Sequence, residues 1–152
     1  MLRLALPMLL VVSGVARAEC RDDRLNLTGG FGEAHFTVRV ADDPAERAQG
    51  LMHVESMATL EGMLFAYDEP QSVSFWMENT LIPLDMLFAG ADGTILAIHE
   101  NAVPMDRTPI PGGDGVQYVL EINGGLAETL GIEPGDVLQH PAIEAGEAGA
   151  CS

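Results

Sequence analysis

The sequence predicts a mainly β fold, in which a compact, barrel-like sheet of antiparallel and mixed strands carries two short helices. Apolar and polar residues alternate in several runs of strand length, most clearly from Val116 to Asn123. Glycine and proline stretches separate these runs and leave room for only two brief helical segments. At 152 residues the chain is long enough for one core, so we expect a single domain from residue 19 to residue 143.

The domain is expected to open with a β-hairpin and a short helix. Leu25 to Leu27 and Ala34 to Ala41 are the strands of the hairpin, on either side of a glycine-rich turn. The helix begins after Asp43, which has an N-cap side chain, and ends at Gly50. A helix this short is not stable alone. We therefore expect it to dock on the sheet through three side chains: Ala45, Ala48 and Leu51.

The stretch from Phe75 to Phe88 contains the only tryptophan of the chain and its densest apolar run. A short strand and a turn at residues 68–70 are expected to precede it. If Phe75 and Met77 face the core, strand alternation places Trp76 on the opposite face. A large aromatic side chain is exposed there unless something covers it, so we expect Trp76 to form part of a pocket wall.

Asp85 lies on the next predicted strand, Leu84 to Gly90, between apolar neighbours. A buried carboxylate without donors is costly, so we expect Asp85 to accept hydrogen bonds. The nearest polar residues before the strand are Asn79 and Thr80, and we expect the donors to come from that turn. Asp85 is then a structural anchor for the turn.

A strand from Thr94 to Val103 ends in polar residues, among them His99 and Glu100, which favours the rim of a pocket. A core histidine bonded to backbone is the alternative for His99. The segment from Pro104 to Gly115 is rich in proline and glycine, and we expect a binding loop or lid there. Arg107 in its middle either meets a ligand or pairs with a neighbouring carboxylate, Asp106 or Asp114.

The second helix is expected from Leu126 to Leu130. Gly131 ends it as a left-handed cap, and Ile132 packs back on it. Pro134-Gly135 then forms a tight turn before the last short strand.

The stretch from Phe75 to Phe88 also resembles a known family, together with GLM at Gly50, GMLF at Gly62 and GIEPGD at Gly131. The chain is similar, from about His35 to Pro141, to the family catalogued as domain of unknown function 192. The resemblance implies a fold and no reaction. The family usually reads FWM-K-NT, and Glu78 stands here in place of the lysine, so an anion-binding role for that lysine is not carried over.

The sequence lacks the usual catalytic signatures, since it has no GxSxG, no HExxH and no phosphate-binding glycine loop. It specifies no cofactor. What remains is a candidate concave site with an apolar and aromatic wall and few polar groups, as in pockets for small ligands. Its expected members are Met52, Met63, Trp76, Asn79, Asp85, His99 and Glu100.

These residues favour a non-catalytic binding or accessory domain that holds a small molecule or the peptide of a partner protein beside Trp76. One alternative is a Cu(I)-type metal-binding protein, because thioether and imidazole ligands suit that ion. It would use His53 or His99 with nearby methionines: Met52, Met57, Met63 and Met77. The other alternative is a hydrolase or isomerase with Asp85 or His99 as the base.

The N-terminus predicts export. Arg3 precedes an apolar run from Leu4 to Val12, and Ala16-Arg17-Ala18 is a small-x-small cleavage site. We expect residues 1–18 to be a cleaved signal peptide and the mature protein to be periplasmic or secreted, without a membrane anchor. In an oxidising compartment the two cysteines, Cys20 and Cys151, are expected to form one disulfide. Residues 144–152 would form a flexible tail that this bond holds.

The charge balance narrows the partners. The chain has 7 Lys and Arg against 23 Asp and Glu, a formal net charge of −16. Such a protein repels phosphate backbones, so we exclude nucleic acid as a partner. Cations and basic proteins fit this charge. We also expect a monomer.

Overall fold

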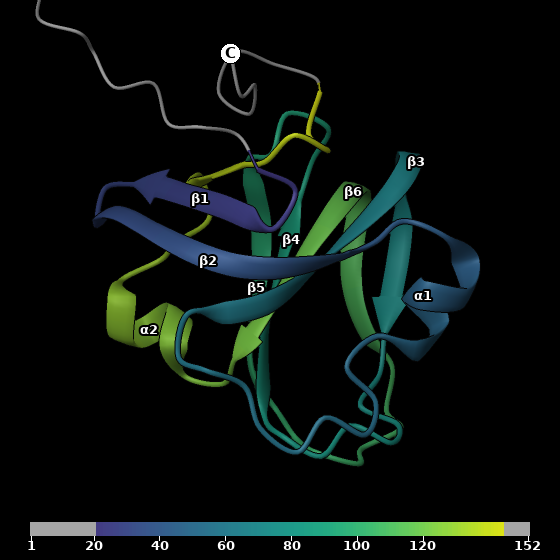
Figure 1. The fold of residues 1–152 in the computed structure, drawn as a ribbon. Coiled ribbons are helices and arrows are strands. Elements are labelled where there is room, and N and C mark those ends of the chain that lie inside the picture. The colour runs from purple at the N-terminus through teal and green to yellow at the C-terminus, as the bar shows by residue number, and fades with distance from the viewer. Residues whose placement is uncertain (1–20, 145–152) are drawn as a thin grey trace, which may run out of the picture.

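The computed structural model describes residues 21–144 and confirms the mainly β fold with two short helices (Figure 1). Seven strands form one sheet in the order β5-β4-β6-β3-β2-β1-β7. The elements are β1 (Arg24–Gly29), β2 (Gly32–Ala41), α1 (Pro44–Gln49), β3 (Glu61–Phe75), β4 (Leu84–Ala89), β5 (Ile95–Ala102), β6 (Ile110–Asn123), α2 (Leu126–Leu130) and β7 (Val137–Gln139).

The sheet curls into a partial barrel. Neighbouring strands pair antiparallel except β2 and β3, which are parallel. A bridge between Thr94 and Val137 connects the segment before β5 to β7, so the two edges of the sheet meet at one end. At the opposite end the connections made by residues 50–60, 76–83 and 103–109 gather at the bottom of Figure 1, and we call them the loop end.

The strands β4 and β6 lie at the centre of the core. All six residues of β4 are buried, and from Tyr118 to Ile122 β6 is buried on both faces. One apolar cluster includes Leu87, Leu120 and Ile122, and the other includes Met86 and Val119. A polar side chain on either face of this pair is therefore inside the protein.

Two sequence predictions about strand ends are wrong. The expected turn at residues 68–70 lies within β3, where the pairing with β6 shifts register between Ala66 and Gln71. Half of the expected loop at residues 104–115 is strand, because β6 begins at Ile110 and pairs with Phe75. The long-range pairing of β3 with β6 resumes after this irregularity, between residues 71–75 and 110–116, and it overrides the glycine and proline content of the two segments.

Helix α1 begins as predicted but docks differently. The Asp43 side chain accepts a hydrogen bond from the Glu46 amide at 2.8 Å, which confirms the N-cap. The helix itself has no buried residue, so Ala45 and Ala48 do not dock it. The helix is held by Leu51, which is buried just after it, and by Arg47. The Arg47 guanidinium donates to the Ala66 carbonyl at 2.9 Å and lies 4.9 Å from the centre of the Tyr67 ring.

Asp85 is fully buried and finds donors, but they are not the expected ones. Its Oδ1 accepts from the amides of Asn101 at 2.8 Å and Gly125 at 2.9 Å, and its Oδ2 accepts from the Ala127 amide at 2.8 Å. No hydrogen bond from Asn79 or Thr80 reaches it within residues 21–144. The carboxylate thus connects β4 to the end of β5 and to the first turn of α2.

Replacing Asp85 with Asn is expected to lower the free energy of unfolding by roughly 1 to 3 kcal/mol, because an amide nitrogen cannot accept from a backbone N–H. Urea denaturation of both proteins measures the difference. Asp92→Asn is the control, since Asp92 is exposed and its one acceptor oxygen, which bonds the Thr94 amide, is kept. Equal midpoints for wild type and Asp85→Asn would contradict this account.

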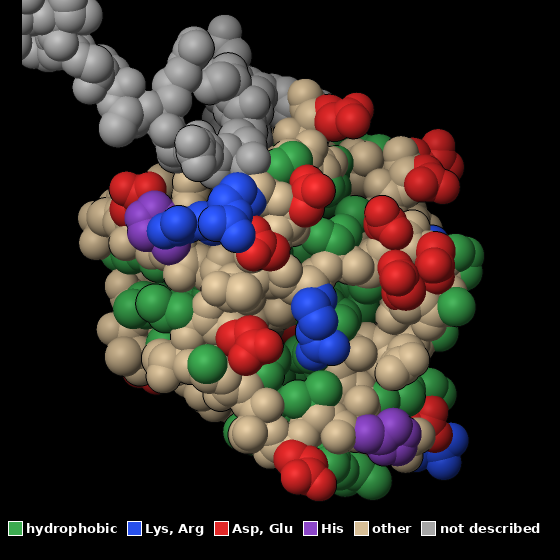
Figure 2. All heavy atoms as spheres, viewed as in Figure 1, with side chains coloured by type: hydrophobic (Ala, Val, Ile, Leu, Met, Phe, Trp, Pro, Cys, Tyr) green, Lys and Arg blue, Asp and Glu red, His purple; other side chains and the backbone are tan. Residues whose placement is uncertain are grey.

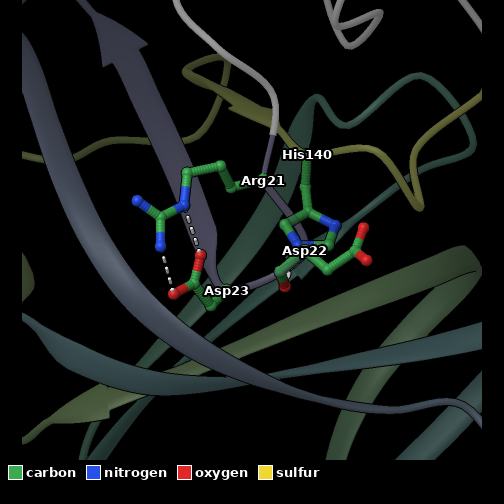
Figure 3. Close-up of polar contacts among 4 residues, drawn as sticks. All are labelled: Arg21, Asp22, Asp23 and His140. Carbon is green, nitrogen blue, oxygen red and sulfur yellow. Dashed lines mark hydrogen bonds and ion pairs between the residues drawn. The ribbon is translucent and has the colours of Figure 1, made fainter.

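The first and last described segments meet at His140 (Figure 3). Its Nδ1 accepts from the Ala142 amide at 3.0 Å, so its Nε2 carries the proton and donates to the Asp22 carbonyl at 2.8 Å. The neighbouring Arg21 and Asp23 form an exposed ion pair at 3.1 Å. Burial lowers the pKa of His140 from its ordinary value of 6.5, which favours the neutral ring that this arrangement requires.

The depressed pKa of His140 has a consequence for stability. The unfolded chain binds a proton at His140 below pH 6.5 while the folded chain does not, so folding is disfavoured as the pH falls. We expect the unfolding free energy of wild type to drop more between pH 7 and pH 5 than that of His140→Gln. The exposed His35, replaced by Gln, is the control. Parallel pH profiles for wild type and His140→Gln would contradict the prediction.

The signal peptide, the Cys20–Cys151 disulfide and the C-terminal tail fall outside residues 21–144, apart from Glu144 at the start of the tail. They stay predictions. Within the described residues no helix has the length and hydropathy needed to cross a membrane.

Candidate functional site

Three carboxylates are buried in the part of the chain that the structure describes: Asp85, Glu121 and Asp136. Two of them are satisfied by backbone. Asp85 has the three amides given above, and Asp136 accepts from the Glu133 amide at 2.8 Å and the Gly30 amide at 3.4 Å. These hydrogen bonds stabilise turns and helix ends, so a structural role accounts for the burial of both carboxylates.

Glu121 is different. It lies on β6, with Met63 of β3 and Met86 of β4 as its register partners, and only 4% of it is exposed. Within residues 21–144 no side chain or amide donates a hydrogen bond to its carboxyl oxygens. Desolvation by burial raises the pKa of Glu121 from 4.5 to about 8, so the carboxyl group is mainly neutral at pH 7.

A cavity of about 40 Å³ includes Glu121 in its lining. The turn after α1 supplies Gly50, Leu51 and Met52 to the wall, β3 supplies Phe65 and Phe75, and Trp76 follows directly after β3. The rings of Phe65 and Phe75 meet edge to face, with their centres 5.1 Å apart. The remaining members are Ala48, Gln49, Glu78 and Thr80. The cavity is thus an aromatic and aliphatic well with a neutral carboxyl group in its lining.

The side of the well at residues 76–78 carries an ion pair. Arg107 donates to Glu78 at 3.1 Å, and its guanidinium carbon lies 5.8 Å from the centre of the Trp76 ring. Arg107 thus pairs with a carboxylate, but not with the expected Asp106 or Asp114. Its side chain is 71% exposed, so water screens this pair and its contribution to stability is small.

The three loops of the loop end are joined by backbone hydrogen bonds. His53 donates to Asn79 at 2.9 Å, Met77 to Asp106 at 2.8 Å and Met105 to Thr80 at 3.0 Å. All four described residues other than glycine with positive φ lie in these loops or at the adjacent end of β5: His53, Asn79, Asn101 and Met105. Such backbone conformations are uncommon outside glycine and gather at functional sites.

Comparison with known proteins gives the family. A profile of the family described as DUF192, Uncharacterized ACR, matches residues 26–140. The chain belongs to the DUF192 family. The resemblance seen in the sequence is thereby confirmed, and the family itself is uncharacterised. No curated protein matches the chain.

Two solved structures resemble this DUF192 chain. One is a protein of unknown function from Novosphingobium aromaticivorans, 45% identical, with a TM-score of 0.75 over 76% of this chain and 83% of that one. The other, from Sinorhizobium meliloti, is described as a "putative transcription regulator". It is 44% identical, with a TM-score of 0.77 over 82% of this chain and 98% of that one.

The structure brings some of the predicted site residues of the DUF192 domain together. Met52 and Trp76 line the well, and the carbonyl of Asn79 holds the neighbouring loop through the His53 amide. Met63 is the buried register partner of Glu121. Whether any of these residues binds a ligand stays a prediction.

Three predicted residues lie elsewhere. Asp85 is one position before Met86 on β4, so it points to the face opposite Glu121. His99 and Glu100 are exposed on β5, at the edge of the sheet. The hydrogen bonds and ion pairs of the described residues include none between Asp85 and His99, the two bases of the hydrolase or isomerase alternative.

The copper alternative gains no support from the fold. Met63 and Met77 pack in the second apolar cluster, and Met77 is fully buried. Among residues 21–144 no three His, Cys, Asp or Glu side chains gather as metal ligands. A site built from methionine and histidine stays a prediction.

Sequence reasoning missed Glu121. Its strand alternates Val116, Tyr118, Leu120 and Ile122 with Gln117, Val119, Glu121 and Asn123, which is typical of a strand with one solvated face. The signal against that interpretation is Val119, an apolar residue on the polar face. The structure covers both faces of β6 from Tyr118 to Ile122, and this long-range packing determines which polar residue is enclosed.

Replacing Glu121 with Gln is expected to raise the free energy of unfolding at pH 7 by roughly 1 to 3 kcal/mol. The pKa of Glu121 is higher in the folded protein than in the unfolded chain, so protonation of Glu121 stabilises the folded wild type fully below pH 4.5. This stabilisation is lost as the pH rises through about 8. Glutamine does not titrate, so the variant does not lose stability in this way. Urea denaturation at pH 5, 7 and 9 measures it, with Glu100→Gln as the exposed control. A variant less stable than wild type at every pH would contradict the prediction.

Proposed function

We propose that this DUF192 domain is a non-catalytic binding module, which holds a basic segment of a partner polypeptide at the loop end beside Trp76. The observation that carries the proposal is the Glu121 carboxyl group, which lines the well, has no donor among residues 21–144 and keeps only a small contact with solvent. A group of this kind costs free energy in the unbound protein, and a binding role is a common reason for retaining it.

The size of the well favours a polypeptide over a free metabolite. Pockets for small ligands occupy roughly 300 to 1,000 Å³. At about 40 Å³ the well admits the tip of one side chain. A partner that inserts one side chain must obtain the rest of its contact from the surface around the well.

That surface is apolar. The loop end exposes five large hydrophobic side chains, and Trp76 is 45% exposed. The others are Leu60, Leu81, Val103 and Met105. A group of exposed apolar side chains is typical of a protein contact surface, and tryptophan is among the residues that contribute most at such contacts.

The charge of the domain favours a basic partner. Acidic side chains are spread over the face in Figure 2, and basic ones are few there. The net charge of −16 attracts positively charged segments and speeds their association. The same charge argues against DNA, although the relative from Sinorhizobium meliloti is described as a "putative transcription regulator".

The proposal places the domain outside the cytoplasm. Its support is the N-terminal segment with Arg3, the apolar run and the small-x-small site. In that compartment the domain would meet exported proteins and the exposed segments of membrane proteins.

Replacing Trp76 with Ala is expected to abolish peptide recognition and to leave folding nearly unchanged, because almost half of the side chain is in water. The probe is a phage-displayed library of random heptapeptides. Wild type is expected to enrich peptides with basic and apolar residues, and Trp76→Ala to enrich none.

The matched control is Leu96→Ala, which removes an equally exposed apolar side chain on β5, away from the loop end. Enriched peptides are then titrated by the fluorescence of Trp76, the only tryptophan in the chain. Equal enrichment by wild type and Trp76→Ala, or no enrichment by wild type, would overturn the proposal.

A further inference from the structure

We propose, on the basis of the binding function above, that the Glu121 well receives a primary ammonium group of the kind at the tip of a lysine side chain. Ammonium entry takes place with release of the Glu121 proton to solvent. The bound state is then an ammonium paired with a carboxylate, and the ammonium keeps its own protons.

The composition of the well selects a cation. Its lining contains no lysine, arginine or histidine, and it contains two carboxyl groups, Glu78 and Glu121. The nearby base, Arg107, is already paired with Glu78. An anionic group entering the well therefore meets no unengaged positive charge.

The aromatic wall favours an ammonium carried on an alkyl chain. Phe65, Phe75 and Trp76 line the well, and the faces of such rings attract cations. Leu51 and Met52 offer aliphatic surface to the methylene groups that precede the charge. At about 40 Å³ the space suits a compact ammonium better than a planar guanidinium.

Glu121 supplies the acceptor. Its carboxyl group has no donor in the described chain, so an ammonium with three N–H groups gives it the hydrogen bonds that Asp85 and Asp136 obtain from amides. The pair forms in a place shielded from water, where a charge-assisted hydrogen bond is strong.

Few other charges act on Glu121. Glu78 and Arg107 face it from the loop end and largely neutralise each other. Tyr67 of β3 interacts electrostatically with Glu121, which raises the pKa of Tyr67. The guanidinium group of Arg47, on α1, lies over the Tyr67 ring. Met63 and Met86 flank Glu121 on β3 and β4, and Asp85 points to the other face. Removal from water is thus what keeps the carboxyl group protonated until a cation arrives.

The test uses a defined probe, Nα-acetyl-lysine N-methylamide. The norleucine analogue is the uncharged control, and the arginine analogue tests whether a guanidinium group can replace the ammonium group. Binding is followed by Trp76 fluorescence. Proton release is measured calorimetrically in two buffers of different ionisation heat.

At pH 6.5 we expect saturable binding of the lysine probe with release of close to one proton. The number of protons released is expected to decline above pH 8, because Glu121 is then ionised before the probe binds. Glu121→Gln is expected to bind about tenfold more weakly and to release no proton. Glu100→Gln, on the edge strand, is expected to behave as wild type.

Several results would overturn the inference. They are norleucine or arginine binding as tightly as lysine, binding of lysine without proton release, and equal affinity of wild type and Glu121→Gln. The proton measurement on wild type needs no variant, so a variant that fails to fold leaves the test intact. If heptapeptides bind through Trp76 while the lysine probe releases no proton, the binding function stands and the ammonium well does not.

Discussion

The burial of β4 and β6 on both faces is the constraint on which the rest of the structure depends. All of β4 and every side chain from Tyr118 to Ile122 of β6 lie inside the protein. Polar residues there are costly unless their groups are satisfied. Asp85 meets this requirement with three amides, and in doing so it fixes β5 and α2 against the sheet. A carboxylate in the core thus determines where two neighbouring elements begin and end.

Asp85 and Glu121 show how one sheet treats two similar groups differently. They lie on adjacent strands. Asp85 is the register partner of Ile122, and Glu121 is the register partner of Met86, so the two carboxyl groups point to opposite faces of the sheet. The face of Asp85 meets the first turn of α2, whose amides are unpaired within the helix and need acceptors. The face of Glu121 meets methionine and phenylalanine side chains, which have no donor to offer. The position of the helix therefore decides which of the two carboxyl groups receives backbone donors.

Local chemistry in the sequence predicted much of the fold. The N-cap at Asp43 and the left-handed Gly131, with φ of 80°, depend on a few adjacent residues, and both are confirmed. What could not be predicted depends on residues far apart in the chain. The donors to Asp85 are 16 to 42 positions away, and the early start of β6 depends on β3. The candidate well has the same origin, because no local pattern places Glu121 beside Leu51 and Trp76.

The residue at position 78 sets the charge beside the well. The family resemblance implies a lysine where this chain has Glu78, and here Glu78 is held by Arg107 from another loop. A lysine at position 78, next to the aromatic wall, would bring a positive charge near Glu121, and an opposite charge nearby favours the ionised carboxylate. With Glu78 paired to an exposed arginine, Glu121 is left without a cation and stays protonated. Under the proposed binding function, a cation at this position would satisfy the carboxyl group from within the protein, and without one that role is left to a ligand.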